Sequence, residues 1–103
     1  MSKKVLVIGS GPAGYPAALK LAALGAEVTV VEKNKAGGVC LNCGCIPSKS
    51  LLDAAHRFFT VKEAKALSSN PEAGDAFFNS FDFAKIQARR QAAVDKLQRG
   101  VLA

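Results

Sequence analysis

Two short apolar runs near the N-terminus flank a longer segment that is rich in alanine and leucine. The runs are residues 4–9 (KVLVIG) and 26–32 (AEVTVVE), and both contain β-branched side chains with little alternation. Continuous runs of this kind are typical of strands buried on both faces of a parallel sheet. Residues 9–25 (GSGPAGYPAALKLAALG) predict a glycine turn and a helix that stops at Gly25. Because two glycines and Pro12 exclude one continuous helix, the pattern predicts a right-handed strand–helix–strand unit.

Beyond residue 46 the chain has a helical pattern. Residues 47–67 and 82–103 predict two long helices, the second with Asp82 as its N-cap and with Gly100 near its end. Residues 68–75 (SSNPEAGD) predict a loop, because a proline and a glycine interrupt them. The expected apolar stripes are Leu51, Leu52, Ala55, Phe58 and Phe59 in the first helix, and Phe83, Ile86, Ala93, Val94 and Leu97 in the second.

The predicted sheet is too small to be complete. Parallel sheets usually have about four to six strands, and no third buried strand follows Glu32. We therefore expect an α/β fold in which residues 1–103 are the opening part of an incomplete Rossmann-like domain. This part consists of the strand–helix–strand unit followed by two long helices.

Composition and charge exclude several classes of protein. Half of the 103 residues are hydrophobic and 21% are charged, which is typical of a globular chain. The net charge is +6, but the basic residues are dispersed and tryptophan is absent, so we expect no nucleic-acid binding. No stretch approaches the roughly 20 apolar residues of a membrane span, and the first apolar run is too short for a secretory signal. We expect a cytoplasmic location and no membrane association.

The first turn has the spacing of a dinucleotide-binding motif, with Gly9, Gly11 and Gly14 in a G-x-G-x-x-G arrangement. The three glycines permit a tight turn, close approach of a pyrophosphate, and close packing of helix on strand, respectively. The free N–H groups and the helix dipole then face the phosphates. Glu32 ends the next predicted strand, where an acidic residue binds a ribose hydroxyl and repels a 2′-phosphate. The alternative is a structural turn with a surface glutamate.

All three cysteines fall within six positions, as Cys40, Cys43 and Cys45. This odd, clustered set does not fit a secreted disulfide framework, and it points to a redox or a metal function. Three thiolates with His56 make four zinc ligands. However, a helix beginning near Cys45 carries His56 about three turns away. We therefore expect no metal site, with zinc binding as the alternative.

Spacing alone leaves the disulfide pairing open. A C-x-x-C pair fits one helical turn, which favours Cys40–Cys43, whereas five residues of regular helix rise about 7 Å. Gly44 and Pro47 nevertheless indicate a break before the helix. That break places Cys45 at a helix N-terminus, where a thiolate is stabilised.

Three segments together resemble the N-terminal part of the flavin-dependent pyridine nucleotide–disulfide oxidoreductases. They are residues 9–14 (GSGPAG), 30–33 (VVEK) and 37–52 (GGVCLNCGCIPSKSLL). The similarity is greatest to the dihydrolipoyl dehydrogenase branch, dense from Lys4 to Leu52 and looser beyond. Glutathione reductases usually carry VPKK where this chain has IPSK. A related disulfide reductase or mercuric reductase is the alternative.

The resemblance implies an FAD-binding domain and a set of cofactor contacts. The glycine turn is expected at the pyrophosphate, Glu32 on the adenosine ribose, and Lys49 near the reactive edge of the flavin. The cofactor-binding residues implied are Gly9, Gly11, Pro12, Ala13, Gly14, Glu32, Lys33, Gly38, Val39, Cys40 and Lys49.

The resemblance also implies that Cys40 and Cys45 form a catalytic redox disulfide. Cys45 is the expected flavin-facing charge-transfer thiol, and Cys40 the interchange thiol that attacks the substrate. Two residues depart from the family pattern: Val39 replaces the usual threonine, and Cys43 replaces the usual valine. We expect Cys43 to be a small buried apolar residue, with exchange to a Cys40–Cys43 disulfide as the alternative.

The implied activity is oxidation of dihydrolipoamide by NAD⁺ through FAD and the disulfide. The expected partners are a lipoamide-type substrate, a 2-oxo acid dehydrogenase complex and, in the full-length form, a second copy. The family's NAD domain and interface domain, with its His–Glu acid–base pair, have no counterpart here, and the context of His56 does not match that histidine. We therefore expect residues 1–103 to be a fragment that binds FAD weakly and is inactive alone. A non-catalytic module that binds FAD or zinc is the alternative.

Overall fold

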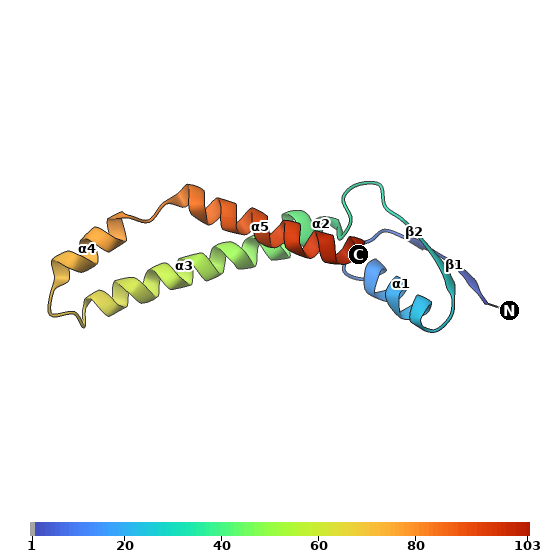
Figure 1. Ribbon diagram of the computed structural model, residues 1–103, viewed down its shortest axis with the longest axis horizontal. Coiled ribbons are helices and arrows are strands. Elements are labelled where there is room, and N and C mark those ends of the chain that lie inside the picture. The colour runs from blue at the N-terminus through green and yellow to red at the C-terminus, as the bar shows by residue number, and fades with distance from the viewer. Residues whose placement is uncertain (1) are drawn as a thin grey trace.

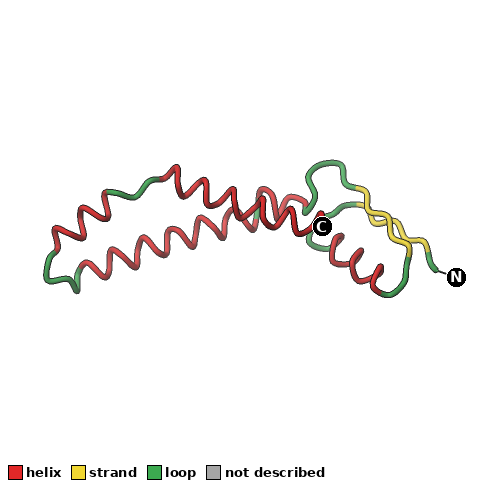
Figure 2. Tube along the Cα trace, in the orientation of Figure 1, coloured by secondary structure: helices red, strands yellow, loops and turns green. Residues whose placement is uncertain are grey.

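The computed structural model describes residues 2–103 as an elongated molecule (Figure 1). Its elements in chain order are β1 (Lys4–Ile8), α1 (Gly14–Ala23), β2 (Glu27–Val31), α2 (Gly38–Cys43), α3 (Cys45–Lys65), α4 (Pro71–Asn79) and α5 (Phe83–Leu102). The extents are 72 × 23 × 17 Å, and the radius of gyration is 20.6 Å, against about 13 Å for a compact domain of this length. Figure 2 shows the two strands gathered at one end and helices along the rest.

The N-terminal part is the expected strand–helix–strand unit. β1 and β2 pair in parallel, from Lys4 opposite Glu27 to Ile8 opposite Val31. α1 connects them and ends before Gly25, whose φ of +87° is readily adopted only by glycine. Within residues 2–103 the sheet has these two strands, so the arrangement is a partial Rossmann-like α/β fold.

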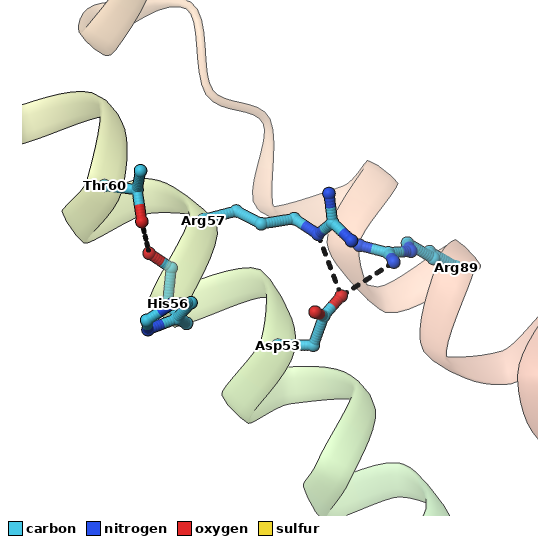
Figure 3. A network of polar contacts seen from close by, with 5 residues as sticks. All are labelled: Asp53, His56, Arg57, Thr60 and Arg89. Carbon is cyan, nitrogen blue, oxygen red and sulfur yellow. Dashed lines mark hydrogen bonds and ion pairs between the residues drawn. The ribbon is translucent and has the colours of Figure 1, made fainter. Parts of the chain in front are cut away.

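α3 and α5 run side by side as an antiparallel pair (Figure 1). α3 buries Ala54 and α5 buries Val94, with 8% and 3% of their surfaces exposed. An ion pair also joins the helices: Asp53 Oδ2 accepts hydrogen bonds from Arg57 Nε at 3.0 Å and from Arg89 Nη2 at 2.7 Å (Figure 3). These bonds, that from Arg57 first, hold the pKa of Asp53 below its ordinary value. Because the pair is exposed, apolar packing contributes more to the docking of the helices.

The far end of the helical pair is closed by α4, in the segment predicted to be a loop. That prediction was wrong for residues 71–75, because proline at the first position of a helix replaces an N–H that has no partner. The side chain of Asn70 caps α4 by accepting from Ala73 N at 3.4 Å. Phe58 of α3 stacks on Phe78 of α4, with their ring centroids 3.9 Å apart. Asp82 caps α5 as expected and accepts from Ala84 N at 2.8 Å.

Much of the expected apolar stripe faces outward. Leu52, Phe59 and Phe83 are 69%, 58% and 66% exposed, so these members of the two stripes are not covered within residues 2–103. Gly100 lies near the end of the last helix, as expected, but it does not terminate the helix, because α5 continues to Leu102. None of the helices in the described range combines the length and the apolar character needed to cross a membrane.

Candidate functional site

The glycine turn lies at the carboxyl ends of the two strands, the edge at which parallel α/β sheets bind their ligands. Gly9 N donates to Val31 O at 2.7 Å, and Gly9 has a φ of +97°. A Cβ on Gly14 would lie 1.8 Å from Gly9 O, whereas a Cβ on Gly11 would meet nothing within 4 Å. Gly14 is therefore required for the packing of α1 on the turn, and Gly11 leaves the outer face of the turn open.

Ser10 fills the turn and joins it to Glu32. Ser10 is 5% exposed, and its N and Oγ donate to Glu32 Oε2 at 2.9 and 2.8 Å. Asn34 N donates to the other carboxylate oxygen at 2.9 Å. The bond from the Ser10 N–H, followed by those from its hydroxyl and from Asn34, lowers the pKa of Glu32 from 4.5 to about 2. Sequence reasoning missed Ser10, although its place between the first two glycines was a usable signal.

Replacing Glu32 with glutamine is expected to weaken the pH dependence of folding. Because the pKa of Glu32 is lowered in the folded state, its stabilising effect is complete above about pH 4.5 and is lost as the pH falls towards 2. Urea unfolding of E32Q across this window should show a smaller loss of stability than the wild type does. The control is E63Q, since Glu63 is exposed near the C-terminal end of α3. An equal loss in E32Q and the wild type would contradict the Ser10–Glu32 geometry.

The three cysteines lie on two helices that Gly44 separates. α2 ends at Cys43, α3 begins at Cys45, and a disulfide joins Cys40 to Cys45 with their Cα atoms 4.8 Å apart. This is the pair implied by the family resemblance, and the C-x-x-C pair favoured by spacing alone is absent from the described residues. The reason is the turn at Gly44, where a Cβ would lie 3.2 Å from Cys40 Cα. α2 was not predicted, because its six residues are too few to show a periodic pattern.

Cys43 is a free and exposed thiol, so the expectation of a buried apolar residue was wrong. Cys43 is the last residue of α2 and lines an open cavity together with residues of α5, which leaves its thiol exposed. Two of the three thiolates needed by the zinc alternative are joined in the disulfide. Nowhere in residues 2–103 do three His, Cys, Asp or Glu side chains gather as a metal site.

The cysteine segment packs directly against the glycine turn through Gly37 and Gly38. Both glycines have positive φ, at +92° and +69°. A Cβ on Gly38 would lie 2.8 Å from Gly11 Cα, and Gly37 N donates to Ser10 Oγ at 3.2 Å. The turn and the disulfide helix, about 30 residues apart in sequence, thus form one site.

Two small cavities flank this contact. One of about 280 Å³ adjoins Glu32, Lys33, Gly38 and Val39. The other, of about 190 Å³, lies between Pro12 and Cys40 and is bordered by α5. Both are smaller than the roughly 300–1,000 Å³ of a closed small-molecule site. Neither cavity alone is therefore large enough to enclose a dinucleotide.

The remaining predicted residues differ in their distance from the turn and in their exposure. Ala13 is the N-cap of α1. Lys49 is exposed on α3, one turn beyond Cys45, and lines neither cavity. Cys45 is more exposed than Cys40, and Cys40 lines the cavity beside the turn. The roles of the two thiols stay a prediction. His56 is exposed on α3 (Figure 3), about three helical turns beyond Cys45.

Asn42, between the disulfide cysteines, binds three partners that sequence reasoning did not predict. Its Nδ2 donates to Ala36 O at 3.0 Å and to Gly38 O at 2.8 Å. Its Oδ1 accepts from Gln98 Nε2 of α5 at 3.2 Å. No local sequence signal indicates this contact, because Asn42 and Gln98 are 56 residues apart.

A parallel strand–helix–strand unit whose glycine turn packs on a disulfide-bearing helix defines a class of redox protein. Residues 3–102 match the family described as pyridine nucleotide-disulphide oxidoreductase, and the chain belongs to this family.

Several similar curated proteins carry the same name. The chain is 46% identical over 98 residues to a dihydrolipoyl dehydrogenase of Geobacillus stearothermophilus, which covers 95% of this chain and 20% of that protein. It is 48% identical over 96 residues to one of Staphylococcus aureus, covering 93% and 19%. A dihydrolipoyl dehydrogenase of Acholeplasma laidlawii is 44% identical over 105 residues, covering 98% and 30%. The chain thus spans about a fifth of the length of the first two relatives.

Proposed function

We propose that residues 1–103 supply the nucleotide-binding turn and the redox disulfide of an FAD-binding domain that oxidises dihydrolipoamide with NAD⁺. The observation that carries the proposal is the packing of the Cys40–Cys45 segment on the glycine turn through Gly38 and Gly11. The names of the relatives give the substrate class. A 2-oxo acid dehydrogenase complex and a second copy of the protein are the proposed partners.

The turn fits the pyrophosphate of a flavin dinucleotide. In the described residues the N–H groups of Gly11, Ala13 and Gly14 have no backbone acceptor, and they lie at the positive end of α1. Gly11 leaves room for close approach. Glu32 is ionised at neutral pH, since its pKa is about 2, so it offers acceptors to a ribose and opposes a 2′-phosphate. Gly9, Pro12, Lys33, Val39 and Lys49 complete the proposed contacts.

The disulfide performs the exchange with substrate. A thiolate of a dithiol substrate attacks Cys40 Sγ, which breaks the Cys40–Cys45 bond and leaves Cys45 as a thiolate. The second substrate thiolate then attacks the substrate sulfur of the mixed disulfide and releases Cys40, so that the substrate leaves as a cyclic disulfide and two electrons stay on the cysteine pair. The N-terminus of the 21-residue α3 stabilises the Cys45 thiolate. A bound flavin supplies the two-electron acceptor that returns the pair to the disulfide.

A chimera tests the proposal. Residues 1–103 replace the matching segment of the Geobacillus stearothermophilus dihydrolipoyl dehydrogenase, and the purified product is assayed for bound FAD and for NADH formation with dihydrolipoamide. We expect both, because the turn and the disulfide are the parts that this segment contributes. A folded chimera that retains no FAD, or that retains FAD without forming NADH, would contradict the proposal.

A further inference from the structure

We propose that Asn42 is a positioning residue for the Cys40–Cys45 disulfide and that Gln98 couples this position to the docking of α5. The inference deepens the proposed function and rests on it, since positioning matters only if the disulfide is reduced and reformed. It is carried by the three hydrogen bonds of Asn42.

A pair of glycines precedes Cys40. Gly37 and Gly38 are both in the left-handed region, where their backbone has the freedom of glycine. Asn42 Nδ2 donates to the carbonyl on each side of Gly37, those of Ala36 and Gly38. One side chain thereby fixes the entry to α2, the helix that carries Cys40.

Asn42 also contacts α5. Gln98 Nε2 donates to Asn42 Oδ1, the one polar side-chain atom of Asn42 that does not bind the carbonyls of Ala36 and Gly38. Asn42 and Gln98 are both half-buried and line the same cavity. The amide of Asn42 is therefore held from both sides, by the glycine pair and by a helix distant in sequence.

The equilibrium between the Cys40–Cys45 disulfide and the dithiol depends on how the two cysteines are held. A disulfide is favoured when its two thiols are held close together. Cys45 is fixed by α3, whereas Cys40 belongs to a six-residue helix that depends on its supports. Loss of the Asn42 contacts should release Cys40 and shift the equilibrium towards the dithiol.

The experiment measures this equilibrium for the 103-residue chain in dithiothreitol redox buffers, by alkylation of the free thiols. A Cys43→Ser background leaves only the two relevant thiols. We expect N42A to shift the equilibrium about tenfold towards the dithiol, which is about 30 mV. N42D should shift it equally, because a carboxylate cannot donate to the two carbonyls. Q98A removes one bond and should shift it about threefold.

The matched control is Q91A, because within residues 2–103 the Gln91 amide bonds only to residues of α5: it donates to Asp95 at 2.9 Å and accepts from Arg90 at 3.5 Å. We expect Q91A to leave the redox equilibrium unchanged, and circular dichroism should show wild-type helix content in Q98A. An unshifted N42A, or a Q91A that shifts as much as Q98A, would overturn the proposal. If N42A does not fold, Q98A decides alone, and an unshifted Q98A overturns the coupling. A background chain whose disulfide is never reversibly reduced would instead contradict the proposed function.

Discussion

Replacing Gly14 with alanine is expected to destabilise the chain by about 3 kcal/mol or more, at the upper end of overpacking effects. The added Cβ would lie 1.8 Å from Gly9 O and 2.9 Å from Gly9 C. Both are backbone atoms, and Gly9 is held to β2 by its hydrogen bond to Val31 O. Relief of the clash therefore requires α1 to move away from the turn.

Urea unfolding followed by circular dichroism measures this effect, with Gly11→Ala as the matched control. A Cβ on Gly11 would meet nothing within 4 Å, so G11A should change the stability by less than about 1 kcal/mol. In the chimera, the same G11A change should lower FAD retention, because its methyl group occupies the open face of the turn. Equal unfolding midpoints for G14A and G11A would contradict the role given to Gly14.

The parts of the fold that follow from local sequence were predictable. The two β-branched runs, the glycine turn and the Asp82 cap each depend on a few adjacent residues, and the structure contains all of them. The Cys40–Cys45 pairing was not predictable from spacing alone, because it depends on the turn at Gly44. Only the resemblance to a family indicated it.

The features that depend on distant contacts were missed or mistaken. The exposure of Cys43 and of Phe59 is set by which helices pack on them, which periodicity does not give. Asn42 and Gln98 meet only because α5 returns along α3 to the disulfide. The helix α4 was not predicted, because a proline disrupts a helix when it lies in the interior. Pro71 instead lies at the first position of α4, where a proline is tolerated.

The second large effect is expected for Cys45→Ser in the chimera. This variant has no Cys40–Cys45 bond for a substrate thiolate to break, so NADH formation should fall by at least about a thousandfold. Cys43→Ser should keep its rate within about twofold, because Cys43 is free and takes no part in the disulfide. FAD retention by both variants is the control for folding. Comparable activity in C45S and the unmodified chimera would contradict the assigned chemistry.

The central claim is that Cys40 and Cys45 form a reversible disulfide from which Cys43 is excluded. All three cysteines lie in one tryptic peptide, residues 36–49, so the most direct measurement is differential alkylation followed by fragmentation of this peptide. One reagent labels the free thiols of the oxidised chain, and after reduction a second labels the rest.

We predict the first label on Cys43 alone and the second on Cys40 and Cys45, with the same pattern after a cycle of reduction and reoxidation. The first label on Cys45 in the oxidised chain, which requires a Cys40–Cys43 bridge, would contradict the account.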